Sequence, residues 1–248
     1  MPESCREISY DDWIRHVFDF PPEDPAWFHR EDSQGGGWYP KDFSEPLLAY
    51  MTRFFKDAGS VLSCYRRRQI DDGLSYLVGA SDFLQEIKND ALALEDRLTC
   101  VNSMFLLYRD LMAPMYGDSL QSCPNSMLTI GFTLDMNNLY TKALRQRRSG
   151  RDLWFACYMW WDVIPVYGGM DCAGHRELGA AVLRLFDRVL REIQVESCVE
   201  SVLHGCGHWY RYYPDDVERI ISSYISRRPK ISAWLRCYAE AARRGNVL

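Results

Sequence analysis

The sequence predicts an all-α protein, and three observations support this fold class. Apolar residues recur at spacings of three and four along most of the chain, which is the period of a helix with one buried face. Glycine and proline separate these stretches, as they do where helices end. A hydrophobic content of 47% beside 25% charged residues is typical of a globular protein, and 248 residues can bury a large core. We therefore expect one helical domain over residues 1–248.

The N-terminal part, residues 1–43, is expected to hold one helix and an irregular segment. Ser9 precedes two aspartates and an apolar stripe, a pattern typical of a helix start. Beyond Pro21 the chain is rich in proline, glycine and aromatic residues. The aromatic residues are too apolar for a free linker, so we expect this segment to lie against the body of the protein; they are Trp27, Phe28, Trp38, Tyr39 and Phe43.

Residues 44–248 are expected to form the helical body. Gly59 and Pro114 stand where two of its helices should end, because glycine adopts the left-handed stop and proline lacks an N–H. The stretch 126–143 contains residues with strand propensity, but its apolar spacing is helical and we expect a helix. The predicted helices span about 44–59, 60–79, 83–87, 91–113, 126–143, 152–164, 178–193, 197–213, 217–225 and 231–245.

The helix expected at 152–164 is apolar on nearly every side. A helix of this kind must be enclosed on most of its surface, so we expect it at the centre of the fold. Asp162, near its end, needs a partner if it is buried, because an unpaired buried carboxylate is costly.

Two stretches of the chain resemble each other. Residues 105–117 and 156–168 each contain an aspartate, then apolar residues, then proline, an apolar residue, tyrosine and glycine. If this reflects repetition, the unit is a long helix, a sharp corner and a second helix. Such units stack into solenoids, because none can bury its faces alone.

With these features, residues 44–248 resemble the HEAT and armadillo class of α-solenoids. The resemblance lies in antiparallel helix pairs, short corners with proline or glycine, and a run of inward aliphatic residues in each helix. It implies an α–α superhelix with a concave surface that binds protein or nucleic acid. It implies no catalytic residues.

The helix expected at 197–213 has two different faces. One face carries the core stripe, and the other carries Glu200, His204 and His208 at successive intervals of four residues. Ser197 and Glu200 match a capping box at its start, and Pro214 is expected to mark its end. The apolar stripe consists of Cys198, Val199, Val202, Leu203, Cys206, Trp209 and Tyr210.

Two glycines interrupt this helix between the histidines. Gly205 and Gly207 each cost about 1 kcal/mol relative to alanine within a helix. We expect compensation from another backbone or a ligand that comes close to them. The expected binding residues are Glu200, His204, Gly205, Gly207, His208 and Trp209.

Two histidines four residues apart on one helix can bind the same metal ion. Glu200, one turn earlier, can serve as a third ligand or as a base. The sequence lacks the glutamate directly after the first histidine that defines the zincin pattern. We expect instead that the histidines bond a neighbouring helix or loop, which the glycines allow to approach, and we assign no metal; His204, His208 and Glu200 are the candidate ligands if one is bound. Other candidate ligands are isolated: Asp110, Asp162, and Asp171 with His175.

Charge and cysteine usage limit the possible partners and compartment. A net charge of −5 and a pI of 5.6 give no general attraction for nucleic acid or anionic lipid. Most arginine runs fall at expected helix C-termini, where cations complement the helix dipole. Nine cysteines without a Cys-x-x-Cys motif, no secretory signal pattern and no apolar run of about 18 residues favour a reducing, cytoplasmic setting.

Three functional hypotheses follow from these patterns. The first is a non-catalytic, protein-binding scaffold that uses a groove beside His204 and His208, with a protein as partner and no cofactor. The second is a metal-assisted hydrolase or lyase built on Glu200, His204 and His208. The third is nucleic-acid binding through arginine patches, which the acidic pI disfavours.

Overall fold

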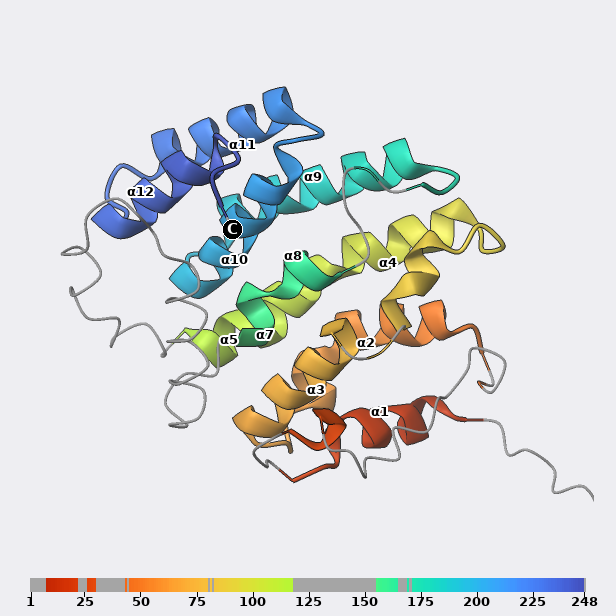
Figure 1. Cartoon of the computed structure of the whole chain (residues 1–248). Helices are drawn as coiled ribbons and strands as arrows, with labels where there is room; N and C mark the ends of the chain where they lie inside the picture. The colour runs from red at the N-terminus through yellow and green to blue at the C-terminus, as the bar shows by residue number, and fades with distance from the viewer. Residues whose placement is uncertain are drawn as a thin grey trace, which may run out of the picture.

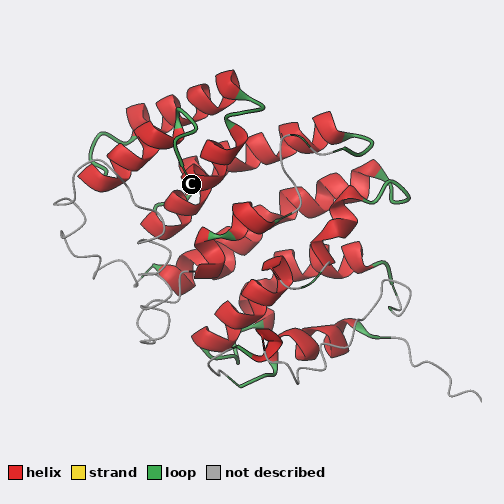
Figure 2. Cartoon of the chain, in the orientation of Figure 1, coloured by secondary structure: helices red, strands yellow, loops and turns green. Residues whose placement is uncertain are grey.

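The computed structural model describes residues 8–21, 26–29, 43, 45–79, 81, 83–117, 155–164, 169 and 171–247. Within these ranges every regular element is a helix (Figure 2), and the one extended pairing is an isolated bridge between Ile8 and Phe43. The all-α prediction is confirmed for this part of the chain. The helix expected at 126–143 lies outside the described residues. No helix in the described ranges has the length and apolar character that crossing a membrane requires.

The described elements are helices of three kinds. Three of them are not α-helices: η1 and η3 are 3₁₀ helices, and η4 is a π-helix. In chain order they are α1 (Tyr10–Phe18), η1 (Trp27–His29), α2 (Leu47–Val61), α3 (Arg67–Gly79), η3 (Phe83–Lys88), α4 (Leu94–Leu107), η4 (Tyr108–Met112), α5 (Ala113–Tyr116), α7 (Phe155–Tyr158), α8 (Trp160–Val163), α9 (His175–Glu192), α10 (Glu196–Trp209), α11 (Pro214–Arg227) and α12 (Ala233–Ala242).

The helices form two rows that run from the N-terminal to the C-terminal end of the molecule (Figure 1). In one row α2 contacts α4, α4 contacts α9, and α9 contacts α11. In the other row α1 contacts α3, α3 contacts α7 and α8, both of these contact α10, and α10 contacts α12. Contacts of α10 with α9 and α11 join the rows. Buried apolar side chains from Tyr10 to Ala242 form one connected core.

The N-terminal aromatic residues that the structure describes pack against this core. Trp27 and Phe43 are buried, and the Phe43 ring meets Tyr50 of α2 edge-on at 5.7 Å. The expectation that this segment lies against the body is confirmed at these residues, whereas Trp38 and Tyr39 lie outside the described part.

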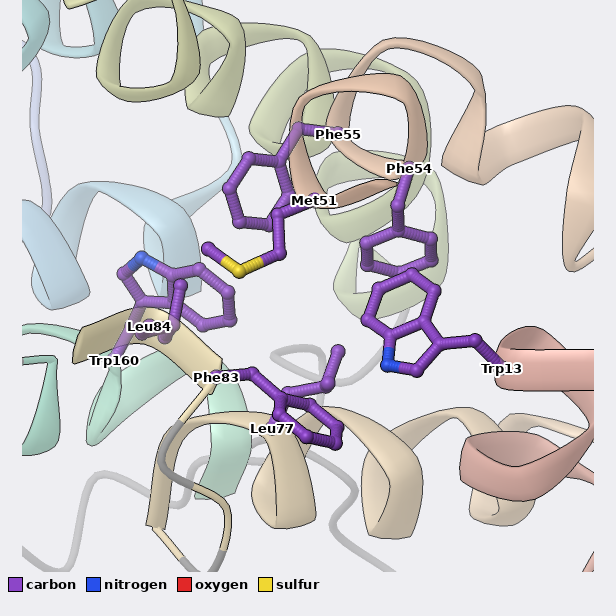
Figure 3. Close-up of a pocket in the computed structure, with 8 residues that line it drawn as sticks. All are labelled: Trp13, Met51, Phe54, Phe55, Leu77, Phe83, Leu84 and Trp160. Carbon is purple, nitrogen blue, oxygen red and sulfur yellow. The ribbon is translucent and has the colours of Figure 1, made fainter. Parts of the chain in front are cut away.

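The apolar centre between α1, α2, α3, η3 and α8 is closely packed. Figure 3 shows side chains from these elements closing around a small apolar pocket with no room for a water molecule. This pocket is therefore part of the core and offers no ligand site. Its lining residues are Trp13, Met51, Phe54, Phe55, Leu77, Phe83, Leu84 and Trp160.

Two predicted helix ends are wrong, and one contact explains both. The chain stays helical through Pro114, because η4 widens into a π-helical turn just before α5. A proline at this position cannot bond the carbonyl of Asp110 and would collide with it in a regular α-helix. That carbonyl oxygen instead lies against Gly59, which sits inside α2 rather than at its end.

The apolar helix expected at 152–164 is divided within the described range. α7 and α8 are separated by a turn at Met159. Trp160 and Trp161 are buried, and the Trp161 ring meets Phe186 of α9 edge-on at 4.7 Å. The expected enclosure of this segment is confirmed for these two tryptophans.

Candidate metal centre

α10 carries the paired histidines, but its ends differ from the prediction. The helix begins at Glu196 with Val195 as the N-cap residue, and no side chain caps it. Ser197 thus lies inside the first turn, and its buried hydroxyl has no hydrogen-bond partner. The predicted capping box is wrong because the helix starts too early for it. Pro214 is the first residue of α11, a position where its missing N–H costs nothing.

The two faces of α10 are arranged largely as expected. The core stripe from Cys198 to Trp209 is buried. The opposite face is also covered, since α7, α8 and α12 pack on α10. His204 is therefore fully buried, whereas the side chain of His208 is 39% exposed. The imidazole of His204 lies among aromatic and carboxylate groups, away from the aliphatic stripe.

Asp162 of α8 joins the two histidines. Its Oδ1 atom lies 2.8 Å from Nε2 of His204 and 2.8 Å from Nε2 of His208. The two Nε2 atoms are 3.2 Å apart. Among the described residues this is the one group of three or more His, Cys, Asp or Glu side chains that brings its ligand atoms so close together.

Electrostatics favour the ionised form of Asp162. Its side chain is only 16% exposed, and burial by itself would raise the pKa of the carboxyl group. Hydrogen bonds from His204 and His208, with the charge of both rings, outweigh burial and lower the pKa of Asp162 below its ordinary value. An ionised carboxylate beside two imidazole nitrogens is a set of metal ligands.

The site extends behind His204 to two tyrosines. Nδ1 of His204 lies 2.6 Å from the hydroxyl of Tyr238 of α12. The ring of Tyr158 of α7 packs on the His204 ring with a centroid separation of 4.5 Å. The two phenol oxygens are 3.5 Å apart. Burial raises the pKa of both phenols, so they stay protonated at neutral pH.

Glu200 is not a member of the three-residue group, contrary to the predicted third ligand. It is half-buried one turn before His204, and its negative charge adds to the effect of burial in raising the pKa of Tyr158 and of Tyr238. Asp162 takes the place predicted for Glu200. The other isolated candidates stay apart: Asp110 pairs with Arg109 at 2.6 Å, and His175 Nδ1 lies 3.2 Å from the carbonyl oxygen of Cys172.

The two glycines of α10 allow close packing by side chains. A Cβ at Gly205 would lie 2.7 Å from the ring of Trp161, and a Cβ at Gly207 would overlap the side chain of Val247. The close approach that the sequence predicts is therefore made by α8 and the C-terminal segment, and neither a backbone nor a ligand is its cause. Trp161 directly precedes Asp162, so Gly205 brings the carboxylate toward the histidines.

Trp209 is a core residue. Its side chain is 1% exposed and lies between Phe186 and Tyr213, with ring centroids at 5.7 Å and 5.5 Å. It cannot present its ring to a partner at the surface, so its expected place among the binding residues has no geometric support.

The arginine runs are engaged within the protein where the structure describes their contacts. Arg68 pairs with Asp72 at 3.1 Å, as the spacing predicts. Arg228 donates to the carbonyl oxygens of Arg191 and Ile193 at the C-terminal end of α9. Arg243 pairs with Glu240 at 2.6 Å. These contacts leave fewer guanidinium groups to bind phosphate.

Comparisons of the chain with protein-family models, with curated proteins and with solved structures gave no match. The function is therefore argued from the geometry of the chain's own residues.

Proposed function

We propose that this protein binds one divalent metal ion, Zn²⁺ or Fe²⁺, through Asp162, His204 and His208. We further propose that the metal activates water in a hydrolase or lyase reaction. The observation that carries this proposal is the convergence of one carboxylate oxygen and two imidazole nitrogens from α8 and α10 within 3.2 Å of one another.

The distances within the group suit a metal site. Ligand atoms about 2.0–2.2 Å from one ion lie roughly 2.8–3.1 Å apart at octahedral angles and roughly 3.3–3.6 Å apart at tetrahedral angles. The three separations of 2.8, 2.8 and 3.2 Å match octahedral angles, whereas a tetrahedral ion requires the ligand atoms to move apart by roughly 0.5 Å.

The type of ligand indicates the type of metal and of site. One carboxylate and two imidazoles suit Zn²⁺ or Fe²⁺, and three protein ligands leave positions for water or substrate. The side chain of His208 is 39% exposed, so these positions are accessible from its side of the site. A structural zinc site would instead be closed by a fourth protein ligand.

The expected chemistry is the activation of water. A bound Zn²⁺ lowers the pKa of its water to about 7, which supplies hydroxide at neutral pH. Glu200 is our candidate for a base rather than a ligand, because it lies outside the three-residue group on the same helix. Proton transfer by such a group contributes typically about 10²–10⁴-fold to a rate.

The test combines metal content with turnover. Protein purified without chelator should contain one metal ion per chain, and it should hydrolyse members of a panel of p-nitrophenyl carboxylate and phosphate esters. A chelator should remove both properties. Asp162→Asn should lose the metal, whereas Glu200→Gln should keep the metal and lose turnover. Protein that contains no metal and takes up neither zinc nor iron would contradict the proposal.

Protein binding is the second candidate, and the two rows of stacked helices favour it (Figure 1). We propose that the rows belong to a HEAT- or armadillo-like superhelix over residues 44–248, within a single domain. A partner would reach His208 and part of Glu200, since His204, Gly205 and Gly207 are buried. Cross-links to a partner confined to α10 and α12 would support this role, and cross-links spread over all helices would contradict it.

A reducing, cytoplasmic setting remains part of the proposal. The seven cysteines that the structure describes are all free, and five of them are buried. A reducing agent should therefore leave the melting temperature of the pure protein unchanged, because these seven thiols form no disulfide. Loss of stability on reduction would contradict this assignment.

A further inference from the structure

Both nitrogens of the His204 ring are engaged. Nε2 lies 2.8 Å from Oδ1 of Asp162, and Nδ1 lies 2.6 Å from the hydroxyl of Tyr238. The ring is fully buried, and Tyr158 packs on it. These contacts fix the orientation of His204 before any metal is bound.

Tyr238 differs from the usual partners of a metal-binding histidine. The outer nitrogen of such a histidine commonly donates to a carboxylate or a backbone carbonyl, and these groups only accept hydrogen bonds. A phenol hydroxyl can both donate and accept. Tyr238 can therefore bond Nδ1 of His204 in either neutral tautomer of the ring.

The two tautomers correspond to the two states of the site. Without metal, the ionised carboxylate of Asp162 accepts a hydrogen bond from Nε2–H of His204, and Nδ1 accepts from the hydroxyl of Tyr238. With a metal on Nε2, the ring proton is on Nδ1 and that N–H donates to the oxygen of Tyr238. In this exchange one proton leaves Nε2 for water and one arrives at Nδ1 from water.

We propose that Tyr238 is a positioning residue for the metal centre. Its hydroxyl keeps the His204 ring in one orientation and reverses from donor to acceptor when the metal binds. The hydroxyl oxygen of Tyr158, 3.5 Å away, can then accept the proton of Tyr238. This inference rests on the proposed function, since it requires a metal at Nε2.

The direct test reads the tautomer of His204 in the full-length protein. Nitrogen-15 NMR of histidine-labelled protein distinguishes a protonated from an unprotonated ring nitrogen. The expected result is a proton on Nε2 without metal and on Nδ1 with one equivalent of Zn²⁺. A protein that binds Zn²⁺ while the proton of His204 stays on one nitrogen would overturn the inference and leave the proposed function standing.

A substitution provides the second test. Tyr238→Phe should weaken Co²⁺ binding by about 10–100-fold, as loss of such outer partners does, and should change the visible spectrum of bound Co²⁺. Tyr50→Phe is the matched control: its buried hydroxyl donates to the carbonyl of Ile8, far from the site. It should leave the Co²⁺ affinity and spectrum unchanged.

The outcomes separate the two claims. Wild-type affinity and spectrum in Tyr238→Phe would overturn the role of Tyr238, whereas wild-type protein that binds no Co²⁺ or Zn²⁺ would overturn the proposed function as well. If Tyr238→Phe does not fold, the tautomer measurement on the wild-type protein decides the inference alone.

Discussion

The ring of Trp161 packs directly on the backbone of Gly205, where a Cβ atom would lie 2.7 Å from it. This contact joins α8 to α10 at the point where Asp162 follows Trp161 and meets His204. The geometry of the proposed centre therefore depends on a residue that has no side chain. The effect of adding a side chain at position 205 on stability and on metal binding can therefore be measured.

Gly205→Ala should destabilise the protein and weaken metal binding together. The added Cβ forces Trp161 away in a packed core, a cost of about 1–3 kcal/mol. The helical preference of alanine over glycine recovers about 1 kcal/mol, so the net loss should be about 0–2 kcal/mol by urea unfolding. Gly79→Ala, where a Cβ meets nothing within 4 Å, is the control and should be neutral or stabilising. Equal stabilities of the two variants would show that the Trp161 contact is not tight.

Gly59→Ala should lower the free energy of unfolding more than Gly205→Ala does, because the new Cβ would meet a backbone carbonyl instead of a side chain. A Cβ there would lie 2.5 Å from the carbonyl oxygen of Asp110 in the π-helical turn. We expect a loss of about 2–3 kcal/mol, which lowers the melting temperature by roughly 4–12 °C in a chain of this size.

The double variant Gly59→Ala with Pro114→Ala tests the stated cause. Alanine at position 114 restores an N–H that can bond the Asp110 carbonyl and draw it away from α2. Part of the lost stability should return. If the second substitution recovers nothing, Pro114 is not the reason for the displaced carbonyl.

His16 should make stability depend on pH. Burial among Trp27, Phe20 and Tyr76 lowers the pKa of this imidazole, so the folded protein holds it neutral while the unfolded chain binds a proton near pH 6.5. The unfolded state then carries more protons, and stability must fall as pH drops below about 6.5 through the lower folded pKa. The stability of His16→Gln should fall less between pH 7 and pH 5, as measured by urea unfolding. An unchanged slope would contradict the burial of His16.

The sequence was sufficient for the fold class and for most of the helices, because the spacing of apolar residues reports which face is buried. The sequence-based prediction of helix ends was wrong where a tertiary contact determines the local backbone conformation. Gly59 and Pro114 are helix-ending residues by local chemistry, yet both lie within helices. Pro114 offers no N–H to the Asp110 carbonyl, and Gly59 leaves room for that carbonyl oxygen. The capping box predicted at Ser197 is wrong for a simpler reason. Ser197 would have to be the N-cap residue, but the helix begins one residue earlier, at Glu196.

The candidate site was only partly visible in the sequence. His204 and His208 are four residues apart on one helix, so their proximity follows from helical geometry. Asp162 comes from a different helix, and its only signal was a carboxylate on an otherwise apolar segment that needed a partner. Glu200 was a candidate for a third ligand or a base because it shares the helix with the histidines. No local sequence pattern indicates that α8 packs on α10 at Gly205, which places the carboxylate of Asp162 closer to the histidines than that of Glu200.

Calorimetric titration of the metal-free protein with Zn²⁺ tests the central claim most directly. We predict one site per chain in the wild-type protein, and a melting temperature that rises by roughly 5–10 °C at a hundredfold excess over Kd. Asp162→Ala should weaken binding more than about 100-fold, beyond the effect of outer partners. Asp110→Ala, at the corresponding aspartate of the similar stretch 105–117, should bind Zn²⁺ as the wild type does. Absence of binding, or equal affinity in the wild type and Asp162→Ala, would contradict a metal centre at Asp162, His204 and His208.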